Sequence, residues 1–281
     1  MMKTYRELLK EGEQKLLAAG IENAAGEAWY FFEDVFSVSR MEYLLDQEQI
    51  CRKEKEIERY QQYIERRSTE YIPMQYLLGN QEFMGLSFRV TPDVLIPRQD
   101  TEVLVEEVLK KVGDAKSILD MCTGSGCIVL SLAYYGNFLR CTGVDISKEA
   151  LKIAKENGKS LAPMVEFIDS DLFAEVEGLY DVIVSNPPYI ATEECGRLMK
   201  EVRDYEPMLA LDGHEDGLYF YRKIIQAAPD HLNPGGYLFF EIGYDQGKSV
   251  PDLMEQAGFT DIAVKQDLAG LDRVVYGRYS N

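Results

Sequence analysis

The chain has 281 residues, a hydrophobic content of 46% and a formal net charge of −18. This length is sufficient for two domains, and the hydrophobic content is typical of a globular protein. The negative charge argues against tight binding to naked DNA or RNA through the phosphate backbone, because such binding requires clustered Lys and Arg.

Signals for metal sites, export and membrane insertion are missing from the sequence. The five cysteines form no Cys-x-x-Cys pair, and the two histidines give no zinc-binding spacing. The first residues lead into a charged amphipathic segment rather than a signal peptide, and no apolar run approaches the roughly 20 residues of a membrane span. We therefore expect a cytoplasmic protein with reduced cysteines, no bound metal and no membrane contact.

Residues 1–78 carry the spacing of amphipathic helices. Leu8, Leu9, Leu16 and Leu17 recur at helical intervals, and Gly20 is a suitable helix end. An aromatic stripe and then a long charged helix follow, with Ile and Tyr along one face. These stripes predict the core of a small helical domain that has no chemistry of its own.

In residues 79–99 the spacing of apolar residues changes to a period of two. This pattern predicts a β-hairpin linker between domains, with its turn near Met84 and Gly85. A polar stretch, Pro97–Glu102, then leads into a helix for which Asp100 or Thr101 is the cap. This stretch is either a loop facing a catalytic crevice or a simple cap, and the pattern alone does not decide between them.

Residues 100–281 predict a domain in which strands and helices alternate after Gly113. Such alternation is typical of a mostly parallel sheet with helices on both faces. The expected strands are 117–121, 139–145, 165–170, 180–185, 236–242, 261–266 and 273–279, and the expected helices are 126–135, 148–157, 217–228 and 246–257.

The first strand of this domain runs into a glycine-rich turn, Cys122-Thr123-Gly124-Ser125-Gly126. Gly124 and Gly126 allow the backbone to pass close to a ligand, and the N–H groups of the following helix point towards it. Asp145 ends the next strand, at about the distance where related folds bind ribose hydroxyls. A nicotinamide dinucleotide is one candidate, but Val129 replaces the third glycine of that fingerprint. The pattern favours an adenosine-type cofactor.

The third strand ends before Asp171 and Leu172. The Asp171 carboxylate could accept a hydrogen bond from an adenine amino group while Leu172 packs on the ring. An ordinary helix cap or turn explains the aspartate equally well.

The fourth strand, with its β-branched run Val182–Val184, ends in Asn186-Pro187-Pro188-Tyr189. Two prolines cannot donate to a sheet, so they end the strand and fix the loop at the carboxyl edge, where such sheets bind ligands. The Asn186 carboxamide oxygen and neighbouring carbonyls are acceptors suited to an NH2 group. We predict that this turn holds the substrate.

These residues resemble S-adenosylmethionine-dependent methyltransferases with a seven-stranded, Rossmann-like sheet. More narrowly, the chain resembles the peptide chain release factor glutamine methyltransferases over nearly its whole length. The matching segments are residues 73–79, 94–98, 100–102, 120–126, 185–190, 205–207, 210–211, 216–218, 232–238, 241–243 and 270–274, besides the N-terminal helical domain.

The resemblance implies a role for each part of the site. The cofactor would be S-adenosylmethionine, bound by the glycine-rich turn Cys122–Gly126 at its methionine end, by Asp145 at its ribose, and by Asp171 with Leu172 at its adenine. Asn186 would contact both cofactor and substrate. The Asn186 oxygen and the Pro187 carbonyl would hold the substrate amide, and Pro188 and Tyr189 would shape the pocket.

The implied reaction is methylation of the side-chain amide nitrogen of the glutamine in the Gly-Gly-Gln motif of class I release factors. Residues 1–78 would then recognise this protein substrate. The sequence departs from the family at Cys122, where glycine is usual, and at Gln99, where proline is common.

Two alternatives remain at this stage. The first is a nucleic-acid base methyltransferase acting on a flipped-out adenine or guanine, since Asn-Pro-Pro-Tyr also occurs there. The second is a non-catalytic cofactor-binding module, against which the intact Asn186–Tyr189 motif argues. We expect no stable binding to nucleic acid.

Overall fold

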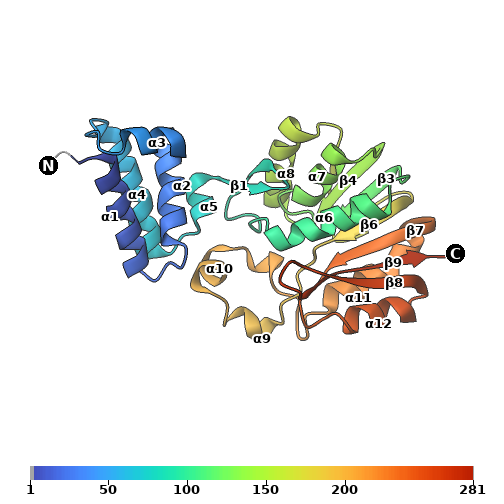
Figure 1. Cartoon of the computed structure of the whole chain (residues 1–281). Helices are drawn as coiled ribbons and strands as arrows, with labels where there is room; N and C mark the ends of the chain where they lie inside the picture. The colour runs from blue at the N-terminus through green and yellow to red at the C-terminus, as the bar shows by residue number, and fades with distance from the viewer. Residues whose placement is uncertain (1–2, 281) are drawn as a thin grey trace. The chain divides into compact units, whose positions relative to one another are not determined.

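A computed structural model describes residues 3–280 and divides the chain into two compact units (Figure 1). The first unit comprises the chain up to Gly79 together with Lys200–Tyr205. The second comprises Asn80–Met199 and the chain from Glu206 onward. Neither unit is therefore a single continuous stretch of sequence.

The regular structure of the first unit is helical. Its helices within the described residues are α1 (Tyr5–Ala18), α2 (Ala24–Phe36), α3 (Arg40–Asp46), α4 (Glu54–Glu70), α5 (Met74–Leu78) and the short α10 (Lys200–Tyr205). Thr4 before α1 and Ser39 before α3 each accept a hydrogen bond from the backbone of a Glu three residues later, whose side chain bonds back to the cap. Such capping boxes satisfy amides that a helix start leaves unpaired.

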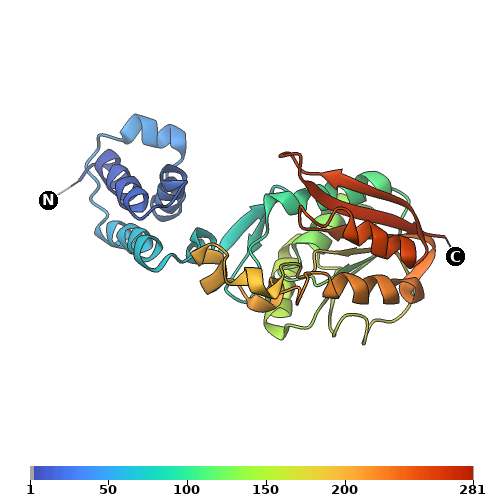
Figure 2. The same cartoon turned by 90° about the horizontal axis from the view of Figure 1, so that it is seen from below.

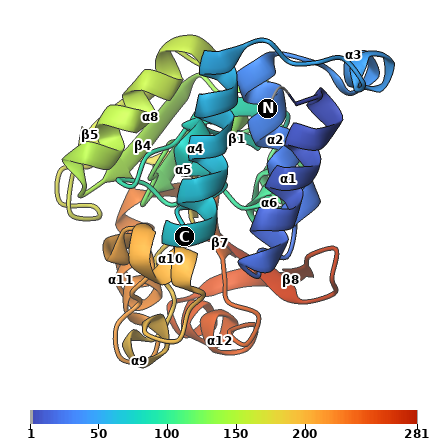
Figure 3. The same cartoon turned by 90° about the vertical axis from the view of Figure 1, so that its left-hand side faces the viewer.

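Helices α1, α2 and α4 lie side by side around an aromatic core (Figure 3). Trp29, Phe32 and Phe36 on α2 are buried, as the sequence pattern predicts. A Cβ atom on Gly12 of α1 would lie 2.1 Å from the hydroxyl of Tyr60 on α4, so only glycine permits this approach.

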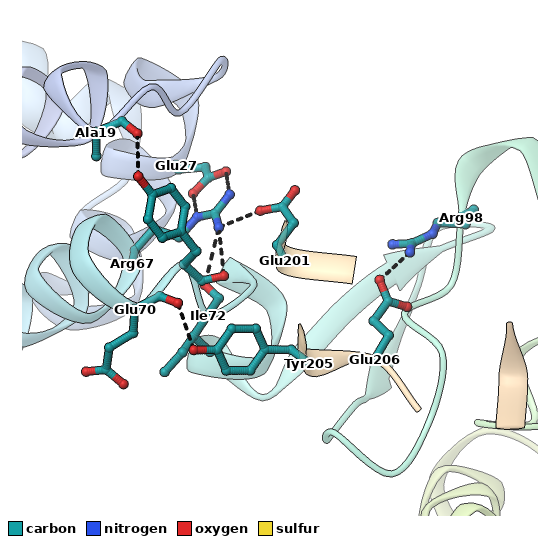
Figure 4. Close-up of polar contacts among 10 residues, drawn as sticks. Ala19, Glu27, Arg67, Glu70, Ile72, Arg98, Glu201, Tyr205 and Glu206 are labelled. Atoms are coloured by element: carbon teal, nitrogen blue, oxygen red, sulfur yellow. Dashed lines mark hydrogen bonds and ion pairs between the residues drawn. The ribbon is translucent and has the colours of Figure 1, made fainter. Parts of the chain in front are cut away.

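A buried arginine on α4 joins helix α10 to the first unit. Arg67 on α4 is 4% exposed, and its guanidinium makes a two-bond ion pair with Glu27 at 2.6 and 2.9 Å. Its third nitrogen lies 2.5 Å from Glu201 of α10 (Figure 4). The Tyr205 hydroxyl also donates to the carbonyl of Glu70 at 2.7 Å. The arginine charge is thus compensated by two carboxylates far apart in sequence.

The second unit is built on a seven-stranded sheet of order β5-β4-β3-β6-β7-β9-β8. Its strands are β3 (Ser117–Met121), β4 (Arg140–Asp145), β5 (Glu166–Asp169), β6 (Tyr180–Ser185), β7 (Leu232–Glu241), β8 (Phe259–Gln266) and β9 (Asp272–Tyr279). Strands β3 to β7 are parallel, and β9 is antiparallel to both β7 and β8. The predicted α/β class and the seven strands are confirmed.

Helices cover both faces of this sheet. On one face pack α6 (Gln99–Lys111), α7 (Cys127–Tyr135) and α8 (Lys148–Leu161). On the other pack α11 (Tyr219–Ala227) and α12 (Ser249–Gln256), which the view from below brings forward (Figure 2). Successive residues of one strand, such as Ile118 and Leu119, enter opposite cores.

The structure corrects several predicted boundaries. Helix α8 was expected to end at 157 but continues through Gly158 to Leu161. A Cβ on Gly158 would lie 3.1 Å from the Phe167 ring, so this glycine allows the ring to pack closely against the helix. Strand β7 begins at Leu232, before the expected 236, with an irregular register against β6. Helix α9 (Thr192–Cys195) and α10 were not expected.

The predicted hairpin at the start of the second unit is present. Strand β1 (Asn80–Phe83) pairs antiparallel with β2 (Leu86–Arg89), and the turn contains Met84 and Gly85. Both turn residues have positive φ, as tight hairpin turns require. Among residues 3–280, no helix is long and apolar enough to cross a membrane.

Candidate functional site

A cavity of about 280 Å³ opens at the carboxyl ends of β3, β4 and β6 in the second unit. The strand order reverses at β3, whose neighbours β4 and β6 lead outward in opposite directions. In α/β sheets such a switch point leaves a crevice that binds ligands. Nine of the predicted site residues line the cavity, namely Cys122, Thr123, Gly124, Ser125, Asp145, Asp171, Leu172, Asn186 and Pro188.

The backbone of the glycine-rich turn is left-handed at three positions, which strains only the non-glycine Cys122. Cys122, Gly124 and Gly126 have φ values of 62°, 55° and 81°, all in the left-handed region. A Cβ on Gly124 would meet no atom within 4 Å, so this glycine leaves open space on the cavity side. A Cβ on Gly126 would lie 2.9 Å from Leu130, so this glycine serves helix packing rather than the cavity surface.

Asp145 holds the same turn from the end of β4. Its two carboxylate oxygens accept hydrogen bonds from the backbone amides of Gly124 at 2.8 Å and Ser147 at 2.9 Å. Burial raises the pKa of Asp145, and these amide hydrogen bonds oppose that shift. Each oxygen retains a lone pair that can accept from a hydroxyl in the cavity.

The predicted adenine-side residues lie beyond β5. Asp171 is exposed at the cavity, and Leu172 beside it is half-buried with a φ of 51°. Ser170 fixes this segment, because its amide donates to the Asp145 carbonyl and its hydroxyl to the Leu172 carbonyl. An apolar side chain and a carboxylate therefore share one wall.

The Asn186–Tyr189 turn leaves β6 at the centre of the sheet edge. The Ser185 hydroxyl donates to the Met121 carbonyl at 2.6 Å, which joins the ends of β6 and β3. Asn186 and Pro188 line the cavity, whereas Pro187 and Tyr189 do not, and the Tyr189 hydroxyl contacts Glu241. The Asn186 side-chain amide donates to the Thr101 hydroxyl at 3.4 Å.

The loop after this turn packs against its backbone. A Cβ on Gly213 would lie 2.8 Å from the Tyr189 Cα, and one on Gly217 would lie 2.3 Å from the Tyr189 carbonyl oxygen. Gln246 donates to the carbonyls of Tyr189 and Gly217 at 3.2 and 3.3 Å. The turn is therefore held rigidly from its outer side.

Two buried carboxyls stand behind the cavity. Asp120, at the end of β3, accepts from the Thr123 hydroxyl at 2.6 Å, and burial raises its pKa to about 7. Glu241, at the end of β7, accepts from the Tyr189 hydroxyl at 3.3 Å, and burial raises its pKa as well. A further carboxyl, Glu206, pairs with Arg98 on the cavity wall (Figure 4). It also accepts a hydrogen bond from the Ile96 amide.

Sequence reasoning assigned no role to Glu241, Gln246 or Glu206, and it left Thr101 undecided. One signal was available, since Glu241 ends an apolar strand run at the sheet edge that carries the other site residues. Gln246 and Glu206 lie in irregular segments, where no periodicity marks them.

Comparisons with known proteins match nearly the whole length of the chain. The PrmC N-terminal domain family matches residues 7–79, and the Methyltransferase small domain family matches residues 98–202. A release factor glutamine methyltransferase of Geobacter sulfurreducens is 41% identical over 98% of this chain and 96% of that protein. The chain belongs to this family. A release factor glutamine methyltransferase of Moorella thermoacetica is 44% identical over 96% of both proteins.

Solved structures with low sequence identity to this chain share its methyltransferase fold. A methyltransferase of Pyrococcus furiosus superposes with a TM-score of 0.55 at 18% identity, over 71% of this chain and 91% of that one. A ribosomal protein L11 methylase of Lactobacillus delbrueckii superposes with a TM-score of 0.51 at 20% identity, over 69% and 86%. Such similarity supports the fold, and function depends on the site.

Proposed function

We propose that this protein methylates the side-chain amide nitrogen of the glutamine in the Gly-Gly-Gln motif of class I release factors, with S-adenosylmethionine as methyl donor. The observation that carries the proposal is the Asn186 carboxamide on the cavity wall, in a turn fixed by prolines and by Gln246. Family membership supports it, because the relatives are named release factor glutamine methyltransferases.

The cavity residues suit S-adenosylmethionine. Asp145 offers acceptors for ribose hydroxyls, and Asp171 with Leu172 offers an acceptor and an apolar surface for adenine. The open space beside Gly124 allows the glycine-rich turn, Cys122–Gly126, to approach the methionine end. When bound, this cofactor supplies an electrophilic methyl group.

The chain's own residues orient the nucleophile. A glutamine amide nitrogen is a weak nucleophile because its lone pair is delocalised into the carbonyl. If the Asn186 oxygen and the Pro187 carbonyl accept its two hydrogens, the nitrogen is held with a defined face towards the methyl group. Orientation and matched hydrogen bonds of this kind lower the barrier without a strong base. Pro188 and Tyr189 keep the turn in place.

We assign recognition of the protein substrate to the helical residues 1–78 and place the reaction in the cytoplasm. Nucleic-acid base methylation is the less favoured activity. The net charge of −18 provides little attraction for a phosphate backbone, and the relatives are named for a protein substrate.

Mass spectrometry of a purified class I release factor, incubated with the enzyme and S-adenosylmethionine, tests the proposal. We expect one added methyl group on the Gly-Gly-Gln peptide. Asn186→Ala should reduce this transfer by about 100-fold or more, with cofactor affinity within about threefold of wild type. Label transfer to DNA or RNA, with the release factor unmodified, would overturn the proposed substrate.

A further inference from the structure

Arg98 brings a positive charge to the wall of the cavity. Among residues 3–280, it is the only Lys or Arg that lines this cavity, whereas three aspartates, Asp93, Asp145 and Asp171, line it as well. The Arg98 side chain is 38% exposed, so a ligand in the cavity can reach it. A guanidinium stays protonated in proteins. An otherwise acidic cavity therefore holds one fixed cation.

The buried carboxylate of Glu206 holds this arginine in place. One of its oxygens pairs with an Arg98 nitrogen, and the other accepts a hydrogen bond from the Ile96 amide at 3.2 Å. The Glu206 side chain is 1% exposed. The remaining guanidinium nitrogens of Arg98 make no hydrogen bond or ion pair to residues 3–280. Since a guanidinium has five N–H donors, Arg98 keeps donors for a ligand.

Arg67 in the helical unit shows that one guanidinium of this protein pairs with two carboxylates. It makes two hydrogen bonds to Glu27 and contacts Glu201 with its third nitrogen. Figure 4 shows both arginines, and Arg98 pairs there with Glu206 alone. The planar guanidinium fits the two oxygens of a carboxylate, which makes such pairs directional. Arg98 thus has the capacity for a second carboxylate.

The strand order gives the position of Arg98 within the cavity. The residues assigned to adenine follow β5, Asp145 ends β4, the glycine-rich turn follows β3, and Asn186 follows β6, the next strand in the sheet. Arg98 directly precedes α6, and Thr101 in the first turn of that helix lies 3.4 Å from the Asn186 Nδ2. Burial raises the pKa of Tyr189 in the same turn, and the Arg98 cation opposes this shift. Arg98 therefore lies at the β6 end, opposite the adenine wall.

The glycine-rich turn offers few amides to an anion at this end. The Gly124 amide donates to the Asp145 carboxylate at 2.8 Å. The Thr123 amide donates to the Val144 carbonyl at 2.9 Å, and the Gly126 amide donates to the Thr123 carbonyl at 2.8 Å. The Asp145 carboxylate also repels any second anion beside this turn. Arg98 is therefore the better partner for an anionic group of the ligand.

We propose that Arg98, held by Glu206, binds the carboxylate at the methionine end of S-adenosylmethionine. This carboxylate is the only anionic group of the cofactor. The ammonium and sulfonium groups are cations, which the aspartates of the cavity favour. The inference rests on the proposed cofactor and adds Arg98 to the residues that bind it.

Calorimetry with two ligands tests this assignment. S-adenosylmethionine and its decarboxylated analogue differ only in the carboxylate. Arg98→Gln should weaken binding of S-adenosylmethionine about tenfold or more, the loss expected for a hydrogen-bonded ion pair. Affinity for the analogue should stay within about threefold of wild type, because that ligand has no carboxylate for Arg98 to bind. Unchanged affinity for S-adenosylmethionine, or an equal loss for both ligands, would overturn the inference.

Arg140→Gln is the matched control for the loss of a positive charge. Arg140 begins β4, donates to the Tyr180 hydroxyl at 2.7 Å and to the Glu177 carbonyl at 2.9 Å, and does not line the cavity. Both ligands should bind this variant within about threefold of wild type. If Arg140→Gln lost affinity for S-adenosylmethionine as selectively as Arg98→Gln, net charge and not a local contact would be responsible, and the inference would be wrong.

A double variant removes the risk of misfolding. Arg98→Gln leaves the buried Glu206 carboxylate without its cation, which is destabilising. Arg98→Gln combined with Glu206→Gln removes both charges and should show the same selective loss of about tenfold or more. Retained affinity for the decarboxylated analogue reports that the site is folded. A double variant that binds S-adenosylmethionine as tightly as wild type would contradict the assignment.

The wild-type enzyme separates this inference from the proposed function. Wild type that binds S-adenosylmethionine through Arg98 but leaves the release factor unmodified would contradict the proposed function alone. Wild type that binds neither ligand would overturn both the proposed cofactor and the role of Arg98.

Discussion

Asp181 and Asp120 lie at opposite ends of two neighbouring parallel strands. Asp181 is near the amino end of β6, and Asp120 is near the carboxyl end of β3. Asp181 accepts four hydrogen bonds, from the Lys116 amide, the Ser117 amide and hydroxyl, and the Asn233 side chain, at 2.7 to 3.1 Å. Burial alone would raise its pKa, but these bonds together lower it. At Asp120, burial raises the pKa to about 7.

The difference lies in how completely each carboxyl is bonded. Among residues 3–280, the buried Oδ1 of Asp120 and Oε2 of Glu241 make no hydrogen bond at the carboxyl edge. Both oxygens of Asp181 are bonded at the amino edge. At the amino ends of the strands, the Asp181 carboxylate therefore fixes β3 and β6 to each other. At the carboxyl ends, Asp120 and Glu241 keep free acceptor oxygens close to the cavity, which lowers the stability of the fold.

The largest expected effect is at Asp120, replaced by Asn. The folded pKa of about 7 lies above the ordinary value of 3.8, so the stabilisation is complete below about pH 4 and is lost as pH rises to 7. At about 1.4 kcal/mol per unit, wild type should lose roughly 3–4 kcal/mol relative to Asp120→Asn between pH 4 and pH 8. Urea unfolding of both proteins measures this difference, and a pH-independent gap would contradict it.

Asp181→Ala should destabilise the protein by about 2–3 kcal/mol at pH 7, because two backbone amides lose a charged acceptor. The sign of its pH dependence is opposite. The lowered pKa of Asp181 contributes stability above the unfolded pKa, which is lost as pH falls. The difference in free energy of unfolding between wild type and Asp181→Ala, measured in urea, should therefore become smaller as the pH falls. A difference that becomes larger in acid would contradict the opposite pH dependence of Asp181 and Asp120.

Asp145→Asn should weaken S-adenosylmethionine binding about tenfold, the loss expected for one hydrogen bond to a charged group. Calorimetry measures the affinity. Asp169→Asn is the control, since Asp169 pairs with Asp145 across β4 and β5 but does not line the cavity. Unchanged affinity in Asp145→Asn would exclude this residue from cofactor binding.

The smallest effect is expected at Cys122, where the left-handed φ of 62° disfavours any side chain. Cys122→Gly should raise the free energy of unfolding by about 0.5–1 kcal/mol, as strain relief exceeds the added flexibility of the unfolded chain. Chemical denaturation measures the change. Destabilisation would mean that packing of the half-buried thiol outweighs the strain.

Local sequence predicted the features that depend on neighbours in the chain. The run Val182–Val184 marks β6, Pro187 ends it, and the glycines after β3 mark the turn at the cavity. The Asn186–Thr101 and Tyr189–Glu241 contacts join residues 85 and 52 positions apart. They depend on strand order and on where α6 begins, which no local pattern contains.

The split composition of the helical unit has a consequence for synthesis on the ribosome. Residues up to Gly79 emerge first, with Arg67 paired to Glu27 alone. Its second carboxylate, Glu201, emerges only after most of the parallel sheet has been made. Removing one partner of a buried ion pair is destabilising. The nascent helical unit is therefore less stable until α10 has been synthesised. The earliest part of the chain to appear is therefore completed late.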